Sequence, residues 1–146
     1  MSVDKATYSE LVLSLTSKLA RMCGRVIEKP LEKQGVSLQE FRITGLLIGE
    51  QGINQKTLAD MLFVKPATLS VAINKLESKG IIKRTVSETD KRVNYLSLCE
   101  GLDLSESNAL ILAVESQMHS GISKADIDTT RKTLNAMISN LEGGVA

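Results

Sequence analysis

Between residues 66 and 78, hydroxyl, amide and small side chains alternate with leucine, alanine and isoleucine. The apolar residues recur three and four positions apart, which predicts a helix with one buried face. Its opposite face would present Ser70, Val71 and Asn74 to solvent. Hydroxyl and amide groups can hydrogen-bond to base edges in the major groove of duplex DNA, and an apolar group can contact the thymine methyl. We therefore expect these three residues to read bases.

Basic and small residues surround the same predicted helix. Lys65 and Thr68 stand near its start, Lys56 and Lys75 lie around it, and Ala67 shares its exposed face. Lysine and threonine side chains bind phosphate oxygens, which position a protein on DNA without reading its sequence. We expect contacts of this kind here, and they would make binding depend on salt.

The charge of the chain is unevenly distributed. The net charge is only +1, which would argue against a nucleic-acid partner if it were spread evenly. Residues 54–92, however, hold eight basic and four acidic residues, a net of +4, whereas residues 101–146 hold three basic and six acidic ones, a net of −3. Attraction to phosphate is therefore expected of the middle segment. Aromatic residues make up 3% of the chain, which favours duplex over single-stranded nucleic acid because few rings are available to stack on bases.

Two short runs rich in β-branched residues, 81–86 and 93–98, are separated by a polar stretch. This pattern predicts a β-hairpin, or wing, whose charged tip contains Asp90, Lys91 and Arg92. An arginine there could enter the adjacent minor groove, where narrow A·T tracts attract cations. Asp90 could orient Arg92 through a charge-assisted hydrogen bond, and a purely structural salt bridge between the two is the alternative interpretation.

The residues before this hairpin predict a helix-turn-helix. The sequence S-x-x-E that starts at Ser37 is a capping box, which predicts a helix over residues 38–49. Asn54 can cap a short second helix. After a turn, Pro66 suits the first position of a third helix, because its missing amide hydrogen has no partner at that position in any case. The second and third helices would form the helix-turn-helix.

Amphipathic helices flank this segment on both sides. Apolar residues recur from Tyr8 to Val26 at steps of three or four, which predicts one long helix. Pro30 should kink or end it, because proline lacks an amide hydrogen and clashes with the preceding turn. Towards the C-terminus we expect a helix over residues 104–118 and a last one capped by Ser123.

Length and composition bound the class of protein. The 146 residues fit a single domain, and 42% hydrophobic with 24% charged residues exclude a disordered chain. No apolar run approaches the roughly 20 residues needed to span a bilayer, and the N-terminus lacks the layout of a secretory signal. We therefore expect a mainly α-helical, cytoplasmic protein with a small β-hairpin wing and no membrane contact.

Taken together, these features resemble the MarR family of bacterial winged helix-turn-helix regulators over about residues 37–101. The resemblance rests on separate pieces of sequence: Leu58-Ala59 with Leu62, Thr68, Leu76-Glu77-Ser78-Lys79-Gly80-Ile81-Ile82, Asp90-x-Arg92, and Leu98 with Gly101. The chain departs from the family at Val71, where arginine or lysine is frequent, and at Cys99, where threonine is. The first departure leaves the operator sequence open.

The resemblance implies a single domain over residues 1–146, in which residues 37–100 form the DNA-binding lobe. By the same similarity, dimerisation helices in residues 1–34 and 102–146 would intertwine with those of a second subunit. The homodimer would bind a pseudo-palindromic operator of double-stranded DNA. Relatives usually repress by blocking a promoter, and many release DNA when a small-molecule effector binds between the dimerisation helices and the lobe. A ligand-responsive repressor is therefore what the resemblance implies.

Two other functions stay open. Cys23 suggests a thiol-based redox sensor; a reactive thiol needs a nearby cation such as Arg21 or Arg25, and a buried cysteine that only fills space is commoner. The second alternative is a winged-helix module that docks a protein without reading bases. Catalysis is not expected because His119 is the only histidine. The two cysteines stand in no CxxC or Cys/His cluster, so we expect no metal and no cofactor.

Overall fold

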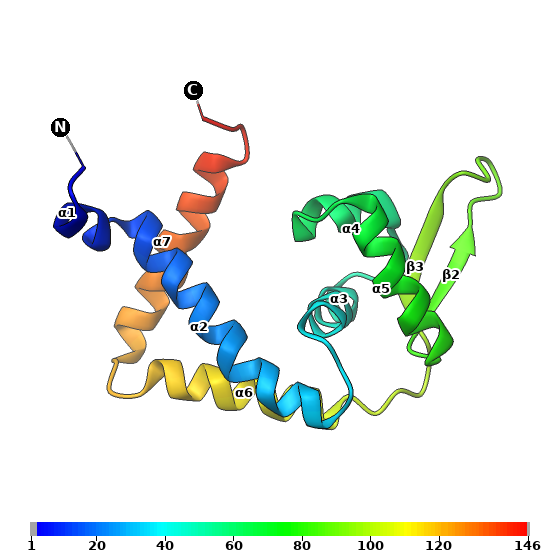
Figure 1. Cartoon of the computed structure of the whole chain (residues 1–146), viewed down its shortest axis with the longest axis horizontal. Helices are drawn as coiled ribbons and strands as arrows, with labels where there is room; N and C mark the ends of the chain where they lie inside the picture. The colour runs from blue at the N-terminus through cyan, green and yellow to red at the C-terminus, as the bar shows by residue number, and fades with distance from the viewer. Residues whose placement is uncertain (1–2, 146) are drawn as a thin grey trace. The chain divides into compact units, whose positions relative to one another are not determined.

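The computed structural model describes residues 3–145 (Figure 1). By its internal contacts the chain divides into two units, Met1–Asn108 and Ala109–Ala146. The elements in chain order are α1 (Lys5–Glu10), α2 (Val12–Lys33), α3 (Leu38–Gly49), β1 (Ile53–Asn54), α4 (Gln55–Leu62), α5 (Pro66–Ser78), β2 (Ile82–Val86), β3 (Asn94–Leu98), α6 (Ser105–His119) and α7 (Lys124–Leu141).

A hydrophobic core lies at the centre of the first unit. α5 turns Leu69, Ile73 and Leu76 inward at the predicted spacing, and each is at most 1% exposed. With Ala72 of the same helix, they share one cluster with buried residues of α3, α4 and the strands: Ile43, Leu47, Ile53, Leu58, Ala59, Ile82, Leu96 and Leu98. Full burial of a leucine or isoleucine side chain contributes about 1.5–3 kcal/mol. The core therefore fixes which face of α5 stays in solvent.

The helices that lead to α5 begin where the sequence predicts. Ser37 Oγ accepts a hydrogen bond from Glu40 N at 3.0 Å, and the Glu40 carboxylate accepts one from Ser37 N at 2.7 Å, so the capping box of α3 is complete. Asn54 Oδ1 accepts from Lys56 N at 2.8 Å and caps α4. Both caps satisfy amides that the helix itself leaves without partners.

Residues suited to turns bound α5 on both sides. Phe63 ends α4 in the left-handed region, with φ of 54°, and Pro66 is the first residue of α5 as predicted. At the other end Gly80, with φ of 73°, lets the Ile81 amide donate back to the Leu76 carbonyl at 2.9 Å. This contact closes the helix and directs the chain into β2.

The three strands form one antiparallel sheet in the order β1-β3-β2. β2 and β3 match the two β-branched runs except for the first residue of each, so the predicted hairpin is confirmed. β1 was not predicted because two residues are too few to show an alternating pattern. Gln51 Oε1 accepts from Leu98 N, and Ser97 Oγ accepts from Gly52 N, both at 2.9 Å, which holds the β1 segment to β3. The loop between β2 and β3 projects beyond the sheet (Figure 1).

The N-terminal helix differs from the prediction at two points. Leu11 has extended dihedral angles, φ −62° and ψ 139°, so the single helix expected there is divided into α1 and α2. The expectation that the helix could end at Pro30 is wrong, because α2 continues to Lys33. Leu31 is 1% exposed, and its burial offsets the hydrogen bond that proline cannot donate. Gly35, with φ of 69°, then closes the helix.

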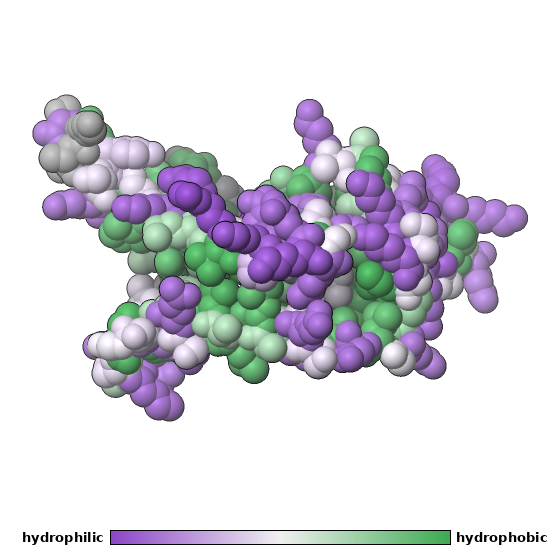
Figure 2. Space-filling view, turned by 60° about the horizontal axis from the view of Figure 1, so that its bottom comes forward, coloured by the Kyte–Doolittle hydropathy of each residue, from purple (hydrophilic) through white to green (hydrophobic). Residues whose placement is uncertain are grey.

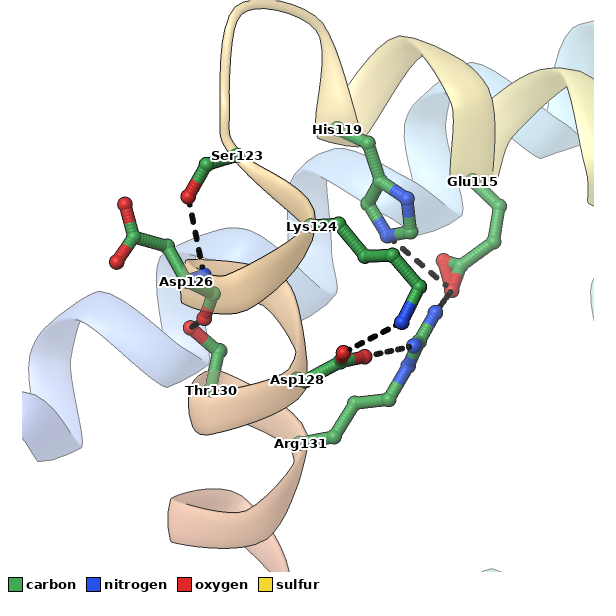
Figure 3. A network of polar contacts seen from close by, with 8 residues as sticks. All are labelled: Glu115, His119, Ser123, Lys124, Asp126, Asp128, Thr130 and Arg131. Carbon is green, nitrogen blue, oxygen red and sulfur yellow. Dashed lines mark hydrogen bonds and ion pairs between the residues drawn. The ribbon is translucent and has the colours of Figure 1, made fainter.

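In the second unit, a short turn joins the C-terminal part of α6 to α7. Ser123 caps α7 by accepting from Asp126 N at 3.1 Å, as predicted. Figure 3 shows the ion pair that links the two helices, in which Arg131 Nη2 lies 3.9 Å from Glu115 Oε1. Within α7, Arg131 Nη1 also donates to Asp128 Oδ1 at 3.2 Å. Exposed pairs of this kind contribute about 0–1 kcal/mol each. No residue of α6 or α7, both of which are described in full, is buried.

Large hydrophobic side chains are exposed on the terminal helices of both units. They are Leu13, Leu15, Leu19, Met22 and Val26 on α2, and Ile111, Leu112, Met118, Leu134, Ile138 and Leu141 on α6 and α7. Figure 2 shows hydrophobic areas of this kind among hydrophilic residues on the face that it presents. Within residues 3–145, no helix combines the length and the apolar character that crossing a bilayer requires. Contiguous apolar side chains in solvent are typical of an interaction surface.

A buried carboxylate connects the start of α3 to the end of α5. Glu40 is 4% exposed, and Lys79 Nζ donates to its Oε1 at 2.9 Å and to the Gly35 carbonyl at 3.1 Å. Burial raises the pKa of Glu40, but the hydrogen bonds from Ser37 and Lys79 outweigh it. The pKa of this carboxyl therefore lies below its ordinary value of 4.5.

Replacing Glu40 with alanine removes both a helix cap and an ion pair. We expect Glu40→Ala to lower the free energy of unfolding by about 2 kcal/mol, a moderate value because Lys79 remains partly solvated. Glu50→Ala, at an exposed position after the other end of α3, should change it by less than about 0.5 kcal/mol. Urea unfolding followed by circular dichroism measures both, and equal stability of the two variants would contradict the role given to Glu40.

The same carboxylate makes stability depend on pH. Because the pKa of Glu40 is lower in the folded chain than in the unfolded one, its contribution is complete above 4.5 and is lost as pH falls through the folded-state pKa. The difference in unfolding free energy between the wild type and Glu40→Gln should be constant from about pH 5 to about pH 7 and shrink in more acidic buffer. Urea titrations at each pH measure this difference, and its growth on acidification would show the opposite sign of shift.

Candidate nucleic-acid interface

The solvent face of α5 carries the side chains expected to read bases. The exposed residues there include Ala67, Thr68, Val71 and Asn74. Ser70 departs from the expectation because it is half-buried. The helix contains no acidic residue before Glu77. The side chains on this face are therefore short, and most of its length carries no negative charge. Both properties allow the helix to approach the phosphates of DNA closely.

Ser70 is held by the preceding helix. Gln55, the first residue of α4, donates from Nε2 to Ser70 Oγ at 3.2 Å. Within the described part of the chain, Gln55 Oε1 is buried and has no hydrogen-bond partner, so the Ser70 contact is what orients this amide. The sequence did not point to Gln55, because its local pattern shows only a polar residue after a helix cap.

Asn74 is held by the wing strand β2. Arg84 donates from Nη2 to Asn74 Oδ1 at 3.1 Å, and its Nη1 lies 3.6 Å from Glu77 Oε1. The Arg84 side chain is 22% exposed, so water screens these contacts only in part. In the sequence, Arg84 contributed only to the net charge of residues 54–92. No local sequence pattern shows which residue of β2 lies beside which residue of α5.

Asp90 and Arg92 form the predicted pair at the tip of the wing. Arg92 Nε and Nη2 donate to the two Asp90 carboxylate oxygens at 3.0 and 3.1 Å, and the Arg92 amide donates to Oδ1 at 3.0 Å. The side-chain bonds, and then the amide bond, lower the pKa of Asp90, and the same side-chain bonds raise the pKa of Arg92. The Arg92 side chain is 90% exposed. The Arg92 guanidinium is therefore held in one orientation and is also accessible to a ligand.

The exposed lysines on the elements around this face include Lys56, Lys65, Lys75 and Lys91. Among the described residues none of the four has an ion-pair partner. Lys65 is the N-cap residue of α5 and gives no side-chain cap, so the first amides of the helix, which carry its partial positive charge, remain unsatisfied. These groups suit contacts to phosphate, as the sequence predicts.

The cysteines lie elsewhere in the chain. Cys23 is in α2 and Cys99 follows β3; both are half-buried and neither forms a disulfide. Across residues 3–145, the His, Cys, Asp and Glu side chains form no group of three or more that could hold a metal ion. The redox role considered for Cys23 stays a prediction.

Comparison with known sequences points to one family. A family model described as the MarR family matches residues 34–93. The transcriptional repressor MdtR of Bacillus subtilis (strain 168) is 29% identical over 96 residues, which cover 66% of this chain and 61% of MdtR. The transcriptional regulator MhqR of the same organism is 28% identical over 86 residues, 58% of either protein. The chain thus spans about three fifths of the length of these relatives.

Comparison with solved structures extends the similarity to most of the chain. A MarR transcriptional regulator from Methanosarcina mazei Go1 is 27% identical with a TM-score of 0.81, over 88% of this chain and 94% of that one. CouR from Rhodococcus jostii RHA1 bound to p-coumaroyl-CoA (21%, TM-score 0.77, 94% and 97%) and the S. aureus MepR-DNA complex (23%, 0.74, 90% and 98%) share the fold. The chain thus has the winged helix-turn-helix fold of these structures, and its residues 34–93 are similar to the MarR family.

Proposed function

We propose that this chain is a transcriptional regulator that binds double-stranded DNA in a sequence-specific manner. α5 would enter the major groove with Ser70, Val71 and Asn74 towards the base edges, and the wing would place Arg92 in the adjacent minor groove. One observation carries this proposal: α5, whose exposed face has no acidic residue before Glu77, is in direct contact with β2 of the wing. A single lobe thus presents both elements to one duplex.

The charge of the lobe supports the same conclusion. Lys56, Lys65, Lys75 and Lys91 are exposed around α5 and the wing, in a segment whose net charge is +4 within a chain of +1. A cationic surface of this kind releases counterions from DNA and supplies affinity that does not depend on sequence. MepR, which has the same fold, was solved as a complex with DNA, and this is the partner we infer here.

We also propose that the chain works as a homodimer through its terminal helices. Leu15, Leu19 and Met22 on α2 are 53%, 47% and 53% exposed, and Ile138 and Leu141 on α7 are 56% and 66% exposed. An isolated helix with an uncovered apolar face is marginal in water, so a second copy would stabilise these segments. Two lobes would then reach successive major grooves, about one helical turn apart, on a pseudo-palindromic operator.

The relatives supply the finer part of the proposal. MdtR is named a repressor and CouR was solved with p-coumaroyl-CoA bound, so we infer a ligand-responsive repressor that acts on DNA in the cytoplasm. Residues 37–100 would be the DNA-binding lobe, and residues 1–34 and 102–146 would dimerise. A small-molecule effector would act by preferring one spacing of the two α5 helices, because a ligand shifts an equilibrium only through differential affinity.

Removing the wing arginine should weaken binding to a duplex recovered by selection from genomic fragments. We expect Arg92→Ala to lower affinity about tenfold and to reduce the magnitude of the log–log salt slope by about 0.9, because one cation that would lie in the minor groove is lost. Fluorescence anisotropy with labelled duplex at several salt concentrations measures both quantities.

The matched control for this experiment is Lys132→Ala, which removes one cation from the exposed surface of α7. It changes the net charge by the same amount, and its affinity should stay within about twofold of the wild type, because α7 carries none of the residues proposed to contact the duplex. Binding that does not change with salt in any variant would favour a protein-docking module and count against the proposal.

A charge on the apolar face of α7 should separate the dimer. We expect Ile138→Glu to give monomers at micromolar concentration, because a carboxylate would have to be buried at the interface. Asn140→Glu adds the same charge two residues along the helix, on its opposite side, and should remain dimeric. Sedimentation velocity measures the mass of each, and a monomeric wild type would refute the assembly.

A further inference from the structure

Arg84 determines how the Asn74 side chain is oriented on α5. A guanidinium group only donates hydrogen bonds, so the atom of Asn74 that faces Arg84 Nη2 at 3.1 Å must be the amide oxygen. The opposite orientation would set two donors against each other. Arg84 is itself fixed by the neighbouring Glu77 carboxylate at 3.6 Å and is only 22% exposed. The Asn74 NH2 group therefore points away from Arg84, and none of residues 3–145 accepts a hydrogen bond from it.

Gln55 has a parallel effect on Ser70. Its Nε2 donates to Ser70 Oγ at 3.2 Å, so the serine oxygen acts as acceptor in that contact, and no acceptor for the hydroxyl hydrogen is found among the described residues. Ser70 and Asn74 are four residues apart and lie one above the other on the same side of α5. In both residues, the side-chain oxygen accepts a hydrogen bond from a neighbouring element. The hydroxyl of Ser70 and the NH2 group of Asn74 can therefore donate to a ligand.

We propose that Arg84, assisted by Gln55, makes α5 a reader of hydrogen-bond acceptors in the major groove. The matching base edges are the O6 and N7 of guanine and the O4 of thymine, whereas cytosine presents only its N4 amino donor there. Adenine would be a weaker match. Its bidentate pairing with asparagine requires the amide oxygen to accept a hydrogen bond from the adenine N6 amino group. At Asn74 that oxygen already accepts from Arg84, so the N6 amino group would lie beside the cationic hydrogens of the guanidinium.

This inference rests on the proposed function and adds a base preference to it. Arg84 is a positioning residue, because it acts through Asn74 and need not touch DNA. A purely structural role, in which Arg84 only ties β2 to α5, would cost stability and overall affinity when Arg84 is replaced. It would leave unchanged the ratio of affinities for two bases at one position, so this ratio separates the two roles.

The experiment selects duplexes from a library with a randomised central segment, using the full-length chain. Asn74→Ala identifies the base pair that faces residue 74, since the preference at that position disappears. Affinities are then measured for four duplexes that differ only in that base pair. We expect the wild type to prefer guanine or thymine over cytosine by about tenfold, the worth of about one hydrogen bond. Arg84→Met should reduce this ratio to about one, while Arg84→Lys, which still donates, should retain part of it.

Two further variants complete the test. Asn74→Asp keeps the contact with Arg84 but offers DNA an acceptor in place of the NH2 group, so it should shift the preference towards cytosine or adenine. Lys83→Met removes the same charge as Arg84→Met from the adjacent residue of β2, which points to the other face of the sheet. It should weaken binding to all four duplexes alike and keep the wild-type ratio. The melting temperature of each variant by circular dichroism confirms that it is folded.

The possible results differ clearly from those that test the proposed function. An unchanged ratio in folded Arg84→Met, or an unchanged preference in Asn74→Asp, overturns the inference while salt-dependent duplex binding stands. A wild type that binds duplexes in a salt-dependent way but shows no preference sensitive to Asn74→Ala also overturns it. A chain with no salt-dependent affinity for any duplex refutes the proposed function itself.

Discussion

The burial of one face of α5 is the constraint on which the rest of the lobe depends. Leu69, Ile73 and Leu76 fix the rotation of the helix about its axis, and a rotation by one residue would turn Asn74 towards the core. The same core contains Ile82 of β2. Because alternate residues of a strand share a face, Arg84 projects from the same side as Ile82, at the edge of the core, where it meets Asn74.

The parts of this arrangement that the sequence predicts are those encoded locally. The capping box at Ser37, the cap at Asn54 and the first turn at Pro66 each involve residues within one turn of helix, and the structure has all three. The break at Leu11, the passage of α2 through Pro30, and the contacts of Gln55 and Arg84 were missed. The continuation of α2 past Pro30 accompanies the burial of Leu31, which depends on tertiary packing. The contacts of Gln55 and Arg84 join residues of different elements, so the local periodicity of the sequence cannot predict them. For the candidate site, residue types were predictable and their partners were not.

The two parts of the chain are stabilised in different ways. The lobe has a core of fully buried aliphatic side chains, whereas α6 and α7 bury none of their residues and are linked by partly exposed ion pairs such as Arg131 with Glu115. Stabilisation of the terminal helices by a second copy would depend on protein concentration. Their order would then be coupled to dimerisation, and any ligand that favours one dimer would also act on the spacing of the lobes.

The cations of the lobe fall into two groups with different tasks. Arg84, Arg92 and Lys79 each face a carboxylate, from Glu77, Asp90 and Glu40 respectively. The exposed lysines Lys56, Lys65, Lys75 and Lys91 have no such partner among the described residues. A paired cation loses part of its long-range attraction but gains a fixed direction, which discrimination between bases requires. An unpaired lysine keeps its full charge and its mobility, which suits contact with any phosphate. In the proposed function, affinity for DNA and preference between bases would therefore depend on different residues of the lobe.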